Sequence, residues 1–337
     1  RGLIQGLWAW EWHLWSSPSL HHAVSLALHA CTAALSGVLA RRVGLSISGA
    51  WFVAGIVLLH PLGIETVAYA AQQGEIVAAV GVLLVAVLTA GRWAWWTPVA
   101  LVLAMMVGMG GKETAVVALV LLPLTLWVMR STWAEVSAWI CGLFAVVGFV
   151  AIYGGNLASI AQIGEIEAAS GSSVTALQWV LVQSTAIVRT LGLLIVPVGL
   201  TVDYDYDRIS QMYRWLAVAV LCGVTLAGLV LRSRWRLEAY CVGAILAVAG
   251  LRLLVQTPRQ YFADHHAYLW LPFFALFVAS AWEWYAVRTP KAMRDTEMSH
   301  VDSDAMVCDL CPTSSRVGTT PDADATPHRT APASQTT

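Results

Sequence analysis

The sequence predicts an all-α protein, a polytopic bundle of about nine or ten transmembrane helices followed by a disordered C-terminal tail. Apolar residues make up 58% of the 337-residue chain and charged residues only 12%. Uncharged runs of helix length recur along most of it, which is typical of helical membrane proteins. From about residue 289 the composition changes to Ser, Thr, Pro, Asp and Ala, which bury too little apolar surface to offset the entropy of ordering. We therefore expect a membrane domain over residues 1–288 and a disordered tail over 289–337.

The membrane domain divides into apolar windows of roughly 17 to 25 residues, the length needed to cross a bilayer. In chain order, spans are predicted near residues 20–40, 46–61, 75–91, 96–111, 113–130, 134–153, 214–231, 237–255 and 267–287.

Residues 174–200 interrupt this series, because Arg189 divides them into two apolar pieces that are each short for a span. We predict an interfacial helix followed by a re-entrant or surface-parallel piece, with a break at Pro197 and Gly199. The segment is also long enough for one ordinary crossing, which would reverse the predicted orientation of one half of the molecule.

Basic residues fall on alternate loops, which the positive-inside rule assigns to the cytoplasm. They are Arg41 and Arg42, Arg92, Arg130, the cluster of Arg232, Arg234 and Arg236, and the group of Arg288, Lys291 and Arg294. The extracytoplasmic loops are then residues 1–18, 60–75, 110–114, 154–173, 200–213 and 256–266. The net charge of -1 gives no indication of a nucleic-acid partner. Because the chain begins with Arg1 and no signal peptide precedes its first apolar run, we expect the natural protein to have a further N-terminal segment.

The loop over residues 60–75, HPLGIETVAYAAQQGE, places His60, Glu65 and Glu75 beside the bilayer. A second charged pair, Lys112-Glu113, lies between two apolar runs. Ionisable groups so placed are costly unless they face a bundle interior or an aqueous cavity, so they are candidate functional residues. Structural roles remain open alternatives: a histidine hydrogen-bonded at a helix end, carboxylates solvated at the surface, and a tight turn with a snorkelling lysine.

Charged residues from distant extracytoplasmic loops would suit an enzyme that acts on a lipid-linked substrate. A carboxylate can accept the proton of an acceptor hydroxyl, while Lys and Arg hold the phosphate of a leaving group. The tryptophans at positions 8, 10, 12 and 15 are expected to form an interfacial belt rather than a sugar platform. Cys308 and Cys311 have the spacing of a zinc knuckle but lack a second pair nearby.

Five segments in series carry a resemblance to a known family. They are HHAVSLALHACTAALSGVLARR, LLHPLGIETVAYAAQQGE, GGKETAVVALVLLPL, RTLGLLIVPVGLTVDYDY and FADHHAYLWLPFFALF. Together, from Arg1 to about Trp284, the chain resembles the multi-spanning glycosyltransferases of the GT-C superfamily. Within it, the chain is similar to the cadherin-targeting O-mannosyltransferases with tetratricopeptide repeats and to their bacterial relatives, although the repeats are absent here.

The resemblance implies transfer of a sugar, mannose in those relatives, from a polyprenyl-phosphate donor to a protein or glycan hydroxyl on the extracytoplasmic face. It implies residence in the bacterial inner membrane, or in the endoplasmic reticulum membrane of a eukaryote. The implied catalytic carboxylates are Glu65 and Glu75. The family's catalytic base is expected in the first extracytoplasmic loop, at or before residue 1, and Glu11 is the only acidic candidate in the part of that loop that this chain contains. The implied donor-phosphate ligands are Lys112, Arg259, His265 and His266, and the implied substrate-binding residues are His60, Glu113, Asp203, Tyr204, Asp264 and Tyr268.

Two departures leave other functions open. Gln73 and Gly74 stand where relatives carry a basic pair, and His265-His266 stands where they carry Arg-Tyr, which makes a phosphate clamp pH-dependent. A flippase for lipid-linked sugars and a non-catalytic scaffold with the same fold are the alternatives. A divalent metal at the phosphate also remains open, because Asp203, Asp205 and Asp207 offer oxygen ligands.

Overall fold

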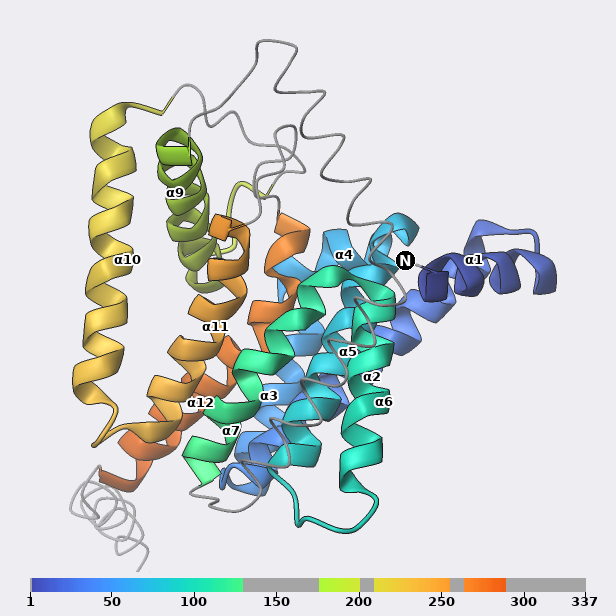
Figure 1. The fold of residues 1–337 in the computed structure, drawn as a ribbon, viewed down its shortest axis with the longest axis horizontal. Coiled ribbons are helices and arrows are strands. Elements are labelled where there is room, and N and C mark those ends of the chain that lie inside the picture. The colour runs from blue at the N-terminus through green and yellow to red at the C-terminus, as the bar shows by residue number, and fades with distance from the viewer. Residues whose placement is uncertain (1, 130–175, 201–208, 255–263, 289–337) are drawn as a thin grey trace, which may run out of the picture. The chain divides into compact units, whose positions relative to one another are not determined.

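The computed structural model describes residues 2–129, 176–200, 209–254 and 264–288 (Figure 1). All regular structure in these ranges is helical, which confirms the predicted fold class for them. The elements are α1 (Gly2–Leu14), α2 (Pro18–Arg42), α3 (Ile47–Leu59), η1 (Pro61–Gly63), α4 (Ile64–Ala68), η2 (Ala70–Gln72), α5 (Gln73–Thr89), α6 (Thr97–Gly111), η3 (Glu113–Val117), α7 (Ala118–Met129), α9 (Ala176–Ile195), α10 (Gln211–Leu231), α11 (Arg236–Leu254), η5 (Asp264–Trp270) and α12 (Leu271–Arg288), where η marks a 3-10 helix. The predicted span at 134–153 and the predicted tail at 289–337, with Cys308 and Cys311, lie outside the described residues.

Four helical segments of the described chain are long and apolar enough to cross a membrane: α2, residues 70–89, α9 and α10. A fifth span results if α3 and the η1–α4 segment, bent by 50° at His60, are taken together. The protein is therefore a helical membrane protein, with fewer full-length spans in these ranges than the sequence predicts. One of the shorter helices is α6, which stops at Lys112 after 15 residues, about 22 Å of helix against a hydrocarbon core of roughly 30 Å.

The segment at 174–200 differs from its prediction. It forms one continuous helix, α9, through Arg189 to Ile195, and by length and composition it is a candidate span. Arginine is a good helix former, and the Arg189 side chain is exposed and reaches the carbonyl of Gly199 at 3.4 Å, so it does not break the helix. The predicted break lies beyond it, where Gly199 adopts a left-handed φ of 74°.

Helix α5 is the centre of the bundle and is buried along most of its length. It packs on α2, on α7 and most extensively on α6. A Cβ added at Gly81 would lie 2.3 Å from the Cα of Gly108, so the two backbones touch at this crossing. Glycines at helix interfaces allow such close approach in membrane proteins.

Contacts within the bundle bring the basic loops to one end. The guanidinium of Arg42 lies beside Gly91, Arg236 lies over the ring of Trp127 at 5.4 Å, and Ser46 bonds to Glu283. We call this the basic end. Because α3 and α6 run away from it and α5 runs back toward it, His60, Lys112 and the first turn of α5 lie at the opposite end. The sequence predicts that this opposite end is extracytoplasmic.

Candidate functional site

The first turn of α5 lies at the meeting point of four helices. Gln73 and Glu75 in this turn are buried. Gly74 between them packs so closely on the end of α6 that an added Cβ would lie 2.9 Å from the carbonyl oxygen of Gly111. Residues two apart on a helix point in nearly opposite directions, so Gln73 and Glu75 reach different neighbours.

On one side, Glu75 pairs with Lys112. The Lys112 ammonium donates to Oε1 of Glu75, and the Thr114 hydroxyl donates to Oε2 at 3.5 Å. Lys112 is the C-cap of α6 and Glu75 lies in the first turn of α5. Each charge therefore lies at the helix end whose dipole favours it. The structure brings these two predicted residues into one ion pair, rather than leaving Lys112 to snorkel alone.

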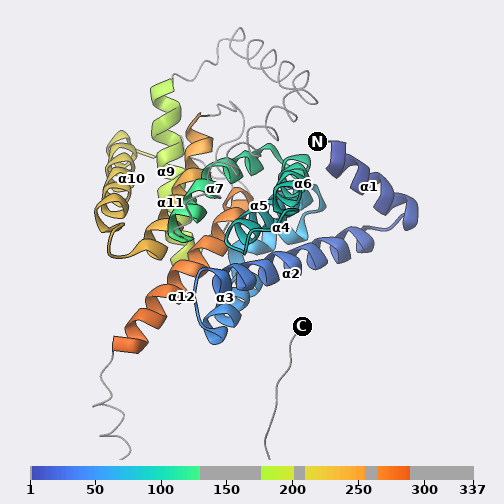
Figure 2. The ribbon, with the colours of Figure 1, turned by 60° about the horizontal axis from the view of Figure 1, so that its bottom comes forward.

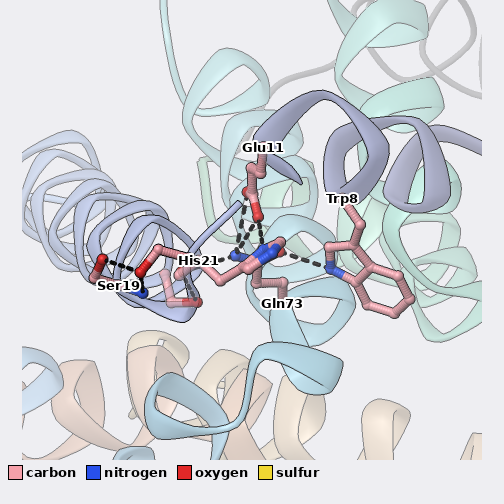
Figure 3. A network of polar contacts seen from close by, with 7 residues as sticks. Trp8, Glu11, Ser19, His21 and Gln73 are labelled. Carbon is pink, nitrogen blue, oxygen red and sulfur yellow. Dashed lines mark hydrogen bonds and ion pairs between the residues drawn. The ribbon is translucent and has the colours of Figure 1, made fainter. Parts of the chain in front are cut away.

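On the other side, Gln73 joins α1 and α2 (Figure 3). Its amide nitrogen donates to both carboxylate oxygens of Glu11, at 3.3 and 3.4 Å, and to the carbonyl of His21 at 3.0 Å. Its amide oxygen accepts from the indole nitrogen of Trp8 at 2.8 Å. Both ends of the Gln73 side chain are thus fixed, and the residue that the sequence marks as a departure connects three helices.

Glu11 is fully buried, and its carboxylate lies within hydrogen-bond distance of Nδ1 of His21. The two residues are brought together by the turn between α1 and α2, where Ser17 caps the second helix and Pro18 begins it. The sequence predicts Glu11 as a candidate but does not identify His21 or Gln73 as its partners. The only signal was a histidine ten residues after the glutamate, across a Ser-Ser-Pro helix start.

A pocket of about 500 Å³ opens beside this pair, lined by Trp8, Ala9, Trp12, His21, Ala70 and Ala71. The rings of Trp12 and His21 stack with centroids 6.5 Å apart. His21 therefore separates the buried Glu11 carboxylate from the pocket. Trp8 and Trp12, two of the four N-terminal tryptophans that we expected in an interfacial belt, line this pocket. Trp10, Trp12 and Trp15 are all exposed.

His60 and Tyr268 belong to a second cluster. His60 donates from Nε2 to the carbonyl of Leu194 at 3.0 Å, and its Nδ1 accepts from the backbone of Leu62. Both ring nitrogens are used at a helix end, which agrees with the structural alternative. The Tyr268 hydroxyl lies 2.6 Å from Nδ1 of the buried His29. A second pocket, of about 310 Å³, is lined by His22, His29, His60 and apolar residues.

The other predicted residues lie on other elements or outside the described residues. Glu65 is half-buried on α4, Glu113 is exposed on η3, and His266 is buried on η5. Arg259, Asp203 and Tyr204 lie outside the described residues, as do the side chains of Asp264 and His265. Among the residues whose side chains are described, no group of three or more His, Cys, Asp or Glu could hold a metal. The acidic residues from Asp203 to Asp207 lie outside the described residues.

No protein-family model, no curated protein and no solved structure matches the chain. The resemblance to GT-C enzymes therefore stays a prediction, carried by the sequence segments alone.

Proposed function

We propose that the protein is a membrane glycosyltransferase that moves one sugar from a polyprenyl-phosphate donor to an acceptor hydroxyl at the end of the bundle opposite the basic loops. The observation that carries the proposal is the Glu11–His21 pair on the wall of an aromatic pocket. The Lys112–Glu75 pair, on the other side of the same helix turn, supports it.

His21 acts as the general base. Its Nδ1 faces Glu11, so Nδ1–H donates a hydrogen bond to the carboxylate. Nε2 is then the unprotonated nitrogen that can take up a proton. The acceptor oxygen attacks the anomeric carbon, its proton passes to Nε2, and the bond from the anomeric carbon to the phosphate oxygen breaks. The polyprenyl phosphate leaves with the electron pair, and the sugar is transferred with inversion. The buried Glu11 orients the imidazole and stabilises the imidazolium that forms.

Lys112 lies on the other side of the first turn of α5 from His21, where its positive charge would attract the anionic donor to this end of the bundle. An ammonium has three donors, and one is taken by Glu75. The Lys112 side chain is 17% exposed and that of Glu75 is 6% exposed, so the cation lies on the outer side of the pair. Glu75 is a positioning residue that holds Lys112 in place. Donors fixed in advance toward developing charge are among the largest contributions to catalysis.

The aromatic walls suit a sugar. Trp8 and Trp12 contribute rigid apolar surface, and the His21 ring lies on the same wall. Apolar walls with a few convergent polar groups are typical of small-molecule sites.

A flippase for the same lipid is the second candidate, favoured by the 50° bend between α3 and the η1–α4 segment. Broken helices line the substrate paths of many transporters.

The test is transfer of radiolabelled sugar from synthetic polyprenyl-phosphate donors by purified protein in nanodiscs. His21→Gln should reduce turnover about 100-fold or more, the usual range for a general base, and Lys112→Ala by a similar factor. His13→Gln is the matched control, since His13 is exposed on α1 and lines neither pocket. Equal turnover by wild type and His21→Gln contradicts the proposed base. Translocation of a fluorescent lipid-linked sugar without any transfer supports the flippase instead.

A further inference from the structure

Helix α10 has a separate surface that glycosyl transfer does not explain. Only 6% of its apolar window is buried, against 72% for the span that contains α5. It packs on α9 and α11 and lies at the edge of the bundle in both views (Figures 1 and 2). A gap of about 560 Å³ remains between α10, α7 and α11.

The gap is apolar along its walls and basic at one end. Leu124, Trp127, Leu229, Val242 and Leu246 line it. Arg232, the residue that follows α10, lines its end. Gly228 and Gly243 both line the gap and add no side chain to it. A Cβ at Gly228 would make an ordinary 3.5 Å contact with Val242, so a longer side chain there would extend into the gap.

The arginines at this end have unused hydrogen-bonding capacity. Arg236 lies over the ring of Trp127, and its Nη1 is buried without a hydrogen-bond partner. In the part of the chain that the structure describes, no carboxylate lies within ion-pair distance of Arg232, Arg234 or Arg236. A buried guanidinium nitrogen without an acceptor is costly, so an anionic ligand at this position would be stabilising.

We propose that this gap binds an anionic phospholipid of the leaflet at the basic end. One acyl chain occupies the gap, and the phosphate accepts hydrogen bonds from Arg232 and Arg236. The planar guanidinium fork matches phosphate oxygens. Basic pockets between transmembrane helices are suited to anionic headgroups. The site is independent of the catalytic proposal, because its residues lie at the other end of the bundle.

Native mass spectrometry of the detergent-purified chain, titrated with phosphatidylglycerol or phosphatidylcholine, tests the proposal. Wild type should bind phosphatidylglycerol more tightly. Arg232→Gln and Arg236→Gln should each weaken that binding roughly fivefold and leave phosphatidylcholine binding unchanged. Arg92→Gln is the matched control, because Arg92 is an exposed arginine on the loop between α5 and α6, whereas Arg232 lines the gap and Arg236 lies over its lining residue Trp127. Equal binding of the two lipids by wild type, or unchanged binding in both variants, overturns the proposal.

A second pair of variants tests the acyl-chain position. Gly228→Leu should fill the gap and reduce occupancy by phosphatidylglycerol. Gly223→Leu, on the same helix where an added Cβ meets nothing within 4 Å, should not. Retained binding in Gly228→Leu overturns the proposed position of the chain. Absence of binding in the wild type would mean that the gap is closed by the protein itself, and would also overturn the proposal.

Discussion

Glu11 and Glu75 are carboxylates from which water is almost excluded, with side-chain exposures of 0% and 6%. Removing a carboxylate from water is costly unless partners replace its hydration. Glu75 has a lysine and a threonine for this purpose, whereas Glu11 has a histidine and the neutral amide of Gln73. Removing one charge of such a buried pair should therefore destabilise the protein more than removing both charges.

Lys112→Met is expected to lower the apparent free energy of unfolding by about 3 kcal/mol or more, because it removes the cation that balances the buried Glu75 carboxylate. Adding Glu75→Gln to the same protein should recover most of that loss, since a neutral amide needs no counter-charge. Unfolding in mixed micelles measures both values. Arg92→Gln, which removes an exposed cation, should stay within about 0.5 kcal/mol of wild type. If the loss in free energy of unfolding of the double variant equals the sum of the losses in the two single variants, Lys112 and Glu75 are not coupled.

At this scale the sequence predicts individual charges but not their partners. Lys112 and Glu75 could be predicted, because both interrupt apolar runs at the same end of the bundle. The contacts of Gln73 with Trp8 and Glu11 could not, because they depend on how α1 lies against α5. Hydrophobic periodicity contains no information about that angle.

Among the helices, α5 and α6 form the closest contact, and its geometry is set by glycine. Gly81 and Gly108 meet backbone to backbone, and Gly111 faces Val77 further along. Because Glu75 and Lys112 lie at the same end of this helix pair, the crossing also sets the distance between them.

Gly81→Ala should destabilise the protein by about 1–3 kcal/mol, the usual cost of overpacking, and should lower transferase turnover by moving Glu75 away from Lys112. Gly55→Ala on α3 is the matched control, since an added Cβ there meets nothing within 4 Å. It should be neutral or slightly stabilising, because alanine is the better helix former. Thermal unfolding of the two variants in the same detergent makes the comparison. Similar melting temperatures would contradict a backbone contact at Gly81.

Helix positions were largely predictable from the sequence, and helix breaks less so. The windows at 20–40, 75–91, 96–111 and 214–231 match α2, α5, α6 and α10 within a few residues. Long apolar runs in a membrane form helices because a helix satisfies the backbone hydrogen bonds within the segment. Arg189 misled the prediction for α9, since a charge is compatible with a helix when it lies on an exposed face. Pro61 and Gly199 coincide with breaks, whereas Pro123 lies inside α7.

For the molecule as a whole, the contacts between basic loops predict one membrane orientation. Arg42 lies beside the loop at Gly91, and Arg236 lies beside Trp127 at the end of α7. The positive-inside rule places this end in the cytoplasm.

Single cysteines introduced into a cysteine-free background would test this orientation. Ser16→Cys and Ala71→Cys, both exposed near the first turn of α5, should react with a membrane-impermeant maleimide in intact cells. Arg92→Cys and Ser233→Cys, exposed at the basic end, should react only after the membrane is permeabilised. The reverse pattern would invert the orientation and move the candidate site to the cytoplasmic face.

The hydrogen bond from Tyr268 to His29 joins residues that are 239 positions apart. At a synthesis rate of about 5–20 residues per second, Tyr268 leaves the ribosome roughly 12–48 s after His29. The contact between Ser46 and Glu283 forms equally late. During biogenesis α2 and α3 must therefore remain in the bilayer with polar groups unsatisfied until the last helix is inserted. Premature termination before η5 would leave this half-built interface exposed to the quality-control proteases of the membrane.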